Sequence, residues 1–433
     1  NQSIAESHLG IITCQSLEYK LFDIINRTMK SLKELYKIGR GPSSSHTMGP
    51  VRASQIFLNG HRDAKAFQVT LYGSLAATGK GHMTDVAIID ELSPVAPVEI
   101  IWKPTVFLPF HPNAMTFKSL DDDGIVTGEW TVYSVGGGTL SEGKKEGDRF
   151  DTDNKVYEMH HLTDIMHWCE KEGRGYWEYV DICEGAGIWD YLLEIWNAMK
   201  KSVERGIEHE GVLPGPLNLA RKAPTYYVKA TGYKQSLQTR GLVYAYALAV
   251  SEENASGGKI VTAPTCGSCG VVPGVLYHLQ KGHNFSDTKI LHALATAGII
   301  GNVVKRNASI SGADVGCQGE VGVACAMAAA AACQLFGGSP SQIEYAAEMA
   351  LEHHLGMTCD PVCGLVQIPC IERNAFAATR ALDANLYAAF SDGRHRVSFD
   401  RVVEVLKQTG HDLPSLYKET SAGGLAKDFG VNF

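Results

Sequence analysis

The chain has 433 residues, with 47 acidic against 39 basic side chains and a formal net charge of -8. This balance, together with the lack of a long basic run, argues against nucleic acid or an anionic membrane surface as a partner. The hydrophobic content of 45% and the charged content of 20% are typical of a soluble globular protein. Because the chain is longer than one hydrophobic core ordinarily supports, we expect two domains. Because the charge balance disfavours nucleic acid and membrane partners, we expect a small-molecule ligand.

Targeting signals and membrane spans are not predicted. The longest Ala-rich apolar run, over 321–336, falls short of the ~18 residues of a spanning helix. Residues 1–30 contain Glu6, Glu18 and Asp23 and lack the apolar region of a signal peptide. The 11 cysteines then indicate reduced thiols and metal ligands more than a disulfide framework. We therefore expect a cytoplasmic protein without a membrane partner.

The first part of the chain predicts an extension followed by a small mixed domain. Residues 1–30 include an amphipathic pattern over 19–25 and are interpreted as an N-terminal extension without chemistry. Residues 31–150 mix helical and strand patterns, which indicates a compact α+β domain. The predicted helices cover 51–58 and 86–91, and the predicted strands cover 66–72, 98–102, 114–117 and 129–135. The charged segment 141–149 is typical of a linker.

Beyond the linker, residues 151–433 predict a larger, all-helical domain. Glycine and proline punctuate the helical patterns, and the abundance of alanine and glycine favours closely packed helices. The predicted helices cover 163–171, 187–205, 236–253, 288–304, 321–336, 341–354 and 402–409.

Three cysteines in this second domain suggest a metal centre. Cys317, Cys359 and Cys370 are each close to a glycine or a proline, so the backbone can approach a bound group closely. Thiolates from separate turns suit a metal or an iron–sulfur cluster, and three ligands on a four-iron cluster would leave one iron open as a Lewis acid. The alternative is that the three are ordinary buried core cysteines, and spacing alone does not decide between the two.

The first domain offers two candidate binding or catalytic turns. Ser43, Ser44 and Ser45 precede His46 and a predicted helix, and free N–H groups with hydroxyls at a helix start suit a carboxylate or phosphate. An elaborate helix cap is the alternative. His82, after a Gly-Lys-Gly turn, is a candidate proton-transfer group or else an ordinary surface histidine.

Eleven motifs, in order over roughly residues 35–425, resemble the bacterial iron–sulfur L-serine dehydratases. The resemblance implies a β domain joined to an α domain that carries an oxygen-sensitive [4Fe–4S] cluster. It also implies conversion of L-serine to pyruvate and ammonia without pyridoxal phosphate, usually in a homodimer. The motifs lie at 38–47, 73–76, 79–85, 111–113, 133–138, 252–255, 262–265, 307–313, 316–322, 358–362 and 369–374.

The resemblance also assigns site residues by position. Cys317, Cys359 and Cys370 resemble the three cluster ligands, and His82 resembles the base that removes the α-proton. The positions at which family members line the substrate pocket are occupied by Ser45, His46, Gly73, Ser74, His111 and Ser134.

Three cysteines depart from the family pattern. Members commonly have Asn at the position of Cys266, Ala near Cys269 and Gly at Cys363, and some end in a cysteine that covers the cluster. We hypothesise that one of these three thiols covers the fourth iron in the resting state. Alternative functions are a related lyase for L-threonine or L-cysteine, a pyridoxal-phosphate dehydratase with Lys80 as Schiff base, and a non-catalytic serine sensor.

Overall fold

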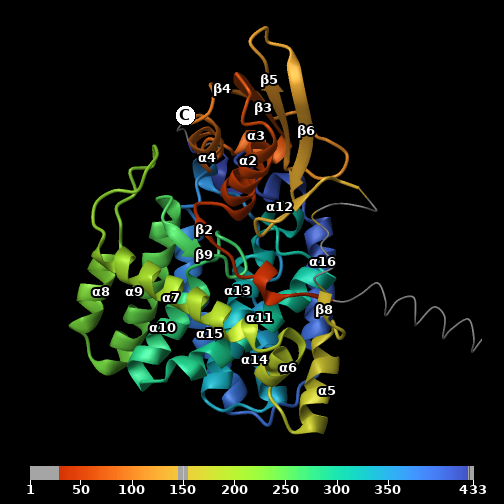
Figure 1. Ribbon diagram of the computed structural model, residues 1–433. Helices are drawn as coiled ribbons and strands as arrows, with labels where there is room; N and C mark the ends of the chain where they lie inside the picture. Colours follow the sequence, from red (N-terminus) through yellow and green to blue (C-terminus); the bar gives the residue numbers. More distant parts are fainter. Residues whose placement is uncertain (1–28, 145–149, 151–154, 428, 430–433) are drawn as a thin grey trace, which may run out of the picture.

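The computed structural model describes residues 29–144, 150, 155–427 and 429. A small α/β region lies against a larger, mostly helical region, with the strands β2 and β9 near the level at which the two meet (Figure 1). The predicted fold class is therefore confirmed. The expected extension over 1–30 falls almost entirely outside the described residues, and the predicted domain boundaries remain predictions.

The α/β region is built on a five-stranded sheet with the order β4-β3-β5-β6-β7. Neighbouring β3 and β4 are parallel and are joined through helices, whereas the remaining pairs are antiparallel. Phe57, Phe67 and Phe117 belong to the core between sheet and helices. The elements are β3 (Ala66–Tyr72), β4 (Val98–Lys103), β5 (Ala114–Leu120), β6 (Val126–Ser134), β7 (Leu140–Ser141), α2 (Gly49–Gly60), α3 (Gly73–Ala77) and α4 (Thr84–Leu92).

The helical region is organised around α13 (Val321–Leu335), which packs against several neighbouring helices. Nearly all of its 15 residues are buried, and seven of them are alanines, so the neighbouring backbones can approach closely. The other helices of the region are α5 (Leu162–Glu172), α6 (Tyr176–Glu184), α7 (Gly187–Glu208), α8 (Ala223–Thr231), α9 (Gln235–Ala255), α10 (Val271–His283), α11 (Asp287–Asn307), α12 (Gly312–Val315), α14 (Pro340–Glu352), α15 (Cys370–Ala389) and α16 (Phe399–Asp412). Among the residues that the structure describes, every helix is too short or too polar to cross a membrane.

The first described residues pack into the helical region before the chain enters the sheet. Two short antiparallel pairs tie them there, β1 (Met29–Lys30) with β8 (Lys155–Tyr157) and β2 (Ile38–Arg40) with β9 (Lys259–Val261). The Tyr36 hydroxyl, fully buried, donates to the Leu294 carbonyl at 2.9 Å. The turn that follows β2 is thus anchored on the helices and enters the α/β region from there.

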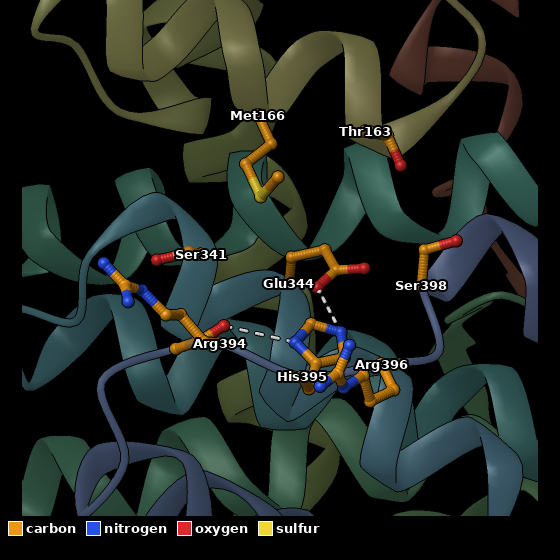
Figure 2. A pocket seen from close by; sticks show the side chains of 9 residues that line it. Thr163, Met166, Ser341, Glu344, Arg394, His395, Arg396 and Ser398 are labelled. Atoms are coloured by element: carbon orange, nitrogen blue, oxygen red, sulfur yellow. Dashed lines mark hydrogen bonds and ion pairs between the residues drawn. The ribbon is translucent and has the colours of Figure 1, made fainter.

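A surface pocket of about 640 Å³ opens near the starts of α5, α14 and α16 (Figure 2). His395 Nε2 forms an ion pair with Glu344 Oε2 at 2.9 Å there. The residues predicted from the sequence to form the functional site lie elsewhere in the fold. The pocket is lined by Thr163, Met166, Ser341, Glu344, Gly393, Arg394, His395, Arg396 and Ser398.

Candidate active site

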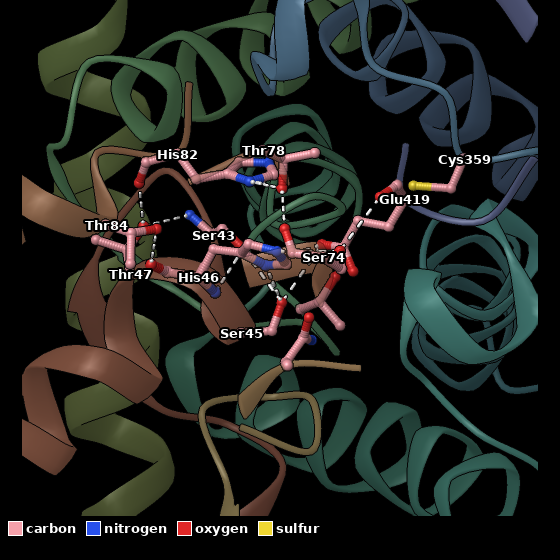
Figure 3. Close-up of polar contacts among 12 residues, drawn as sticks. Ser43, Ser45, His46, Thr47, Ser74, Thr78, His82, Thr84, Cys359 and Glu419 are labelled. Atoms are coloured by element: carbon pink, nitrogen blue, oxygen red, sulfur yellow. Dashed lines mark hydrogen bonds and ion pairs between the residues drawn. The ribbon is translucent and has the colours of Figure 1, made fainter. Parts of the chain in front are cut away.

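Hydrogen bonds tie together the two candidate turns of the α/β region. In the serine-rich turn before α2, Ser43 Oγ accepts from the His46 N–H at 3.1 Å, as the expected helix cap requires. Thr47 Oγ1 donates to the His82 carbonyl at 2.7 Å, and Thr84 Oγ1 donates to the His46 carbonyl at 2.6 Å. The rings of His46 and His82 lie with their centroids 4.5 Å apart (Figure 3).

The turn that carries His82 lies directly against the helical region. A Cβ atom at Gly81 would come within 2.6 Å of the Gly364 carbonyl oxygen and 2.9 Å of the Cys363 carbonyl oxygen, so only glycine fits there. His82 is 1% exposed, so the alternative of an ordinary surface histidine is wrong.

The hydrogen bonds around His82 determine which ring nitrogen carries the proton. Thr78 Oγ1 donates to the Ser74 carbonyl at 3.0 Å and therefore accepts from the Nδ1–H of His82 at 3.1 Å. Burial, and secondly the charge of His46, lower the pKa of His82 well below 6.5. His82 is therefore a neutral imidazole, and its Nε2 lone pair can accept a proton.

The predicted residues Ser45, His46 and Ser74 come together beside His82. Ser45 Oγ lies 2.8 Å from His46 Nδ1, and Ser74 Oγ lies 3.4 Å from His46 Nε2. Burial lowers the pKa of His46 to about 4, so this ring is also neutral near pH 7. The three side chains offer hydroxyl and ring N–H donors.

Of the other predicted residues, Gly73 begins α3, His111 lies in the loop before β5, and Ser134 ends β6. Gly73 has a φ of 51°, and a Cβ there would lie 2.5 Å from the Pro112 carbonyl oxygen. The Asn113 N–H donates to His111 Nδ1 at 3.1 Å, and the Ser134 N–H donates to the Asn113 carbonyl at 2.9 Å. On the side of the helical region, His111 Nε2 lies 3.6 Å from a carboxylate oxygen of Asp314, a residue of α12.

Several buried polar atoms at this junction have no hydrogen-bond partner within the described part of the chain. Buried polar groups in folded proteins nearly always have a partner. A group of atoms without one, drawn from the sheet loops and the helical region, therefore indicates a site for a polar ligand. The atoms are His111 Nε2, both amide atoms of Asn113, Ser134 Oγ, Ser311 Oγ and Glu419 Oε2.

Two acidic residues of the site were missed from the sequence. Glu419 Oε1 lies 3.3 Å from His46 Nδ1, and burial, followed by the charge of Glu320, raises the pKa of Glu419 well above its ordinary value. Glu320 Oε1 accepts from Thr265 Oγ1 at 2.7 Å, and its Oε2 lies 3.9 Å from Cys359 Sγ. The glycine-rich sequence around Glu419 indicates a turn, but it does not indicate where that turn packs.

The structure brings Cys317, Cys359 and Cys370 to the same part of the helical region. Cys317 follows α12, Cys359 lies in the loop after α14, and Cys370 is the first residue of α15. Burial raises the pKa of all three thiols, that of Cys317 to about 11, and the pKa of Cys359 also responds to the charges of the other two. In Figure 3, Cys359 lies near Glu419, on the side away from His46.

The residues around these three thiols help to decide whether they suit a single metal ion or an iron–sulfur cluster. Among the described residues, no three His, Cys, Asp or Glu side chains form a site for a single metal ion. The partly buried guanidinium of Arg373 interacts with Cys317 and Cys370 and opposes the rise in their pKa. Three thiols beside a compensating cation fit an iron–sulfur cluster, which is held by thiolates and carries negative charge.

The thiols at the positions that depart from the family pattern are also located. Cys266 is fully buried, and its Sγ lies 3.3 Å from Met48 Sδ. Cys269 Sγ lies 3.9 Å from the Val250 carbonyl oxygen. Cys363 lies in the turn beside Gly81 with a φ of 56°. Whether one of them covers an iron stays a prediction.

The fold and the site together define a class, that of enzymes in which a small sheet region and a helical region enclose one polar site. Residues 31–100 match the family model "Serine dehydratase beta chain", and residues 113–426 match "Serine dehydratase alpha chain". The chain therefore belongs to the serine dehydratase family, with its alpha and beta parts in one polypeptide.

Named relatives are similar over nearly their whole length. An L-serine dehydratase of Streptomyces coelicolor is 40% identical, over 92% of this chain and 98% of the relative. L-serine dehydratase TdcG of Escherichia coli is 41% identical, over 92% of this chain and 99% of the relative. An L-serine dehydratase of Helicobacter pylori is 37% identical, over 92% of this chain and 98% of the relative.

Proposed function

We propose that this protein is an iron–sulfur-dependent L-serine ammonia-lyase that converts L-serine to pyruvate and ammonia. The observation that carries the proposal is the neutral, buried His82 beside His46, which contacts Glu419, while the segment of Glu419 is held beside the proposed ligand Cys359. The membership of the serine dehydratase family and the names of the relatives support the choice of substrate.

In this proposal the α/β region binds the substrate and moves its proton. The donors of Ser45, His46 and Ser74 hold the carboxylate of serine, and Nε2 of His82 accepts the α-proton. Loss of the β-hydroxyl as water leaves aminoacrylate. Aminoacrylate tautomerises to an imine, which water hydrolyses to pyruvate and ammonia.

The proposed cofactor is a [4Fe–4S] cluster held by Cys317, Cys359 and Cys370, and no role is proposed for pyridoxal phosphate. When bound, the cluster supplies Lewis-acid assistance to departure of the hydroxyl, which is a poor leaving group. Arg373 stabilises the thiolates of Cys317 and Cys370 that such a cluster needs, because its charge opposes the rise in pKa that burial causes.

We also propose that the protein is a cytoplasmic homodimer. Exposed apolar residues on α15 and directly after it support self-association, since Phe376 is 62% and Phe390 84% exposed. Light scattering coupled to size exclusion tests this point.

The test of function is an anaerobic assay after reconstitution with iron and sulfide. We expect pyruvate and ammonia in equal amounts from L-serine, with lower kcat/KM for L-threonine and L-cysteine. Serine binding without release of ammonia by the reconstituted protein would favour a sensor. Activity without iron that borohydride abolishes would favour a pyridoxal-phosphate enzyme.

A further inference from the structure

Glu419 reaches the active site from the segment that follows α16. The Cys359 N–H donates to the Tyr417 carbonyl at 2.8 Å, and the Thr420 N–H donates to the Cys359 carbonyl at 3.3 Å. These bonds hold the segment beside Cys359. The Ser74 hydroxyl, 3.3 Å from the Glu419 carbonyl oxygen, ties it to the α/β region as well. Glu419 therefore lies where the two regions meet (Figure 3).

The carboxylate of Glu419 is only partly satisfied. Its Oε1 lies 3.4 Å from Ser45 Oγ and 3.3 Å from His46 Nδ1, and the backbone N–H of Ala313 also favours the charged carboxylate, whereas its Oε2 is buried without a close hydrogen-bond partner. Among the described side chains, no lysine or arginine forms an ion pair with Glu419, which is 9% exposed. The charged form of a carboxyl group in this state is unfavourable, and a cationic ligand would stabilise it.

We propose that Glu419 binds the α-ammonium group of the amino-acid substrate through its Oε2. This inference rests on the proposed function and deepens it, because it names the group that selects amino acids. An ammonium group brings the positive charge and the N–H donors that Oε2 lacks. Ser74 Oγ and His46 Nε2, which do not contact the carboxylate of Glu419, remain for the carboxylate of the substrate, and His82 remains for the α-proton.

The proposal explains how the site distinguishes amino acids from similar hydroxy acids. Glycerate and 3-hydroxypropanoate carry the carboxylate and the hydroxyl of serine but no ammonium group. Bound in this site, they would offer Glu419 no cationic partner and would therefore lack the charge pairing that favours an amino acid. A shape-based pocket without Glu419 would discriminate less, since an amino and a hydroxyl group are similar in size.

The test compares two probes that differ in the ammonium group, L-alanine and propanoate, neither of which can lose a hydroxyl. Binding is measured by anaerobic calorimetry on reconstituted wild-type protein and on Glu419→Gln, which keeps the size of the side chain. Glu404→Gln is the matched control, because Glu404 is exposed and contacts Arg401 on α16. Iron content and melting temperature are measured for each variant, so that loss of the fold or of the cluster is recognised.

We expect Glu419→Gln to weaken L-alanine binding by about 30- to 1000-fold, as for removal of one partner of a buried charge pair, and to change propanoate binding by less than about 3-fold. Unchanged L-alanine affinity, or equal weakening of both probes, overturns the inference. Failure of the wild type to form pyruvate from L-serine would instead overturn the proposed function. The binding of L-alanine and propanoate would still show whether Glu419 binds an ammonium group, because neither measurement depends on turnover.

Discussion

His82 is held neutral by its surroundings, and this has a measurable consequence for the pH dependence of the reaction. Because burial lowers its pKa well below 6.5, the ring stays unprotonated at pH values at which an exposed histidine would be half charged. A base must be unprotonated to accept a proton, so the bound complex loses activity as the pH falls through this lowered value. We expect kcat, measured at saturating L-serine so that Glu419 is already paired with the substrate ammonium group, to remain level through about pH 6.5 and to fall only well below it.

The measurement is a pH–rate profile on the reconstituted enzyme, with His82→Ala for comparison. The variant is expected to lose about 10²- to 10⁴-fold in kcat while it retains its iron, since His82 is not among the proposed ligands. An acid limb centred above 6.5, or a variant with normal kcat, would refute the role given to His82.

Some residues of the candidate site could be predicted from the sequence, and others could not. Motifs identified His46, Ser74 and His82, which hydrogen bonds through Thr78 and a ring contact between the two histidines now connect. Glu419 was missed because it joins the site through contacts across 374 residues of sequence, which no local pattern records. Local patterns predict a turn well, but they do not predict what that turn packs against.

At the scale of elements, Asp400 couples the start of α16 to the start of α5. Its carboxylate accepts from the Leu162 N–H at 2.8 Å, the Thr163 N–H at 2.9 Å and Thr163 Oγ1 at 2.7 Å. These N–H groups belong to the first turn of α5 and have no partner within the helix. One side chain thus caps a helix that is distant in sequence.

We expect Asp400→Ala to lower the free energy of unfolding by ~2–4 kcal/mol, because it leaves two backbone donors and a hydroxyl without their charged acceptor. Urea denaturation measures the difference. Glu404→Ala is the control on the same helix, and its exposed pair with Arg401 should be worth less than about 0.5 kcal/mol. Equal stability of the Asp400 variant and the control would contradict this account of the cap.

The predicted elements match the structure best where the periodic pattern is long. The helix expected over 187–205 is α7, and the strand expected over 66–72 is β3. The 20-residue helix α15 was not among the predicted helices, although its buried residues recur at helical spacing. Its buried face consists mostly of alanines, which give a weak contrast between the apolar and polar sides.

On the scale of the whole molecule, the order of a mixed region followed by a helical region could be predicted from composition and periodicity. The packing of residues 29–40 into the helical core could not, because the pairings of β1 with β8 and of β2 with β9 join distant segments. The close contact of Gly81 with Gly364, which brings the histidines towards the helical region with the thiols, could not be predicted either. Tertiary contacts of this kind create the site.

The central claim is that Cys317, Cys359 and Cys370 hold an iron–sulfur cluster on which dehydration of L-serine depends. The most direct measurement is iron per chain, together with pyruvate formation, in anaerobically reconstituted wild type and the three single Cys→Ala variants, with the buried Cys325→Ala as control. We predict about four iron atoms per chain in the wild type and the control, and loss of both iron and activity in the three variants. Wild-type iron content and activity in any of the three would contradict the claim.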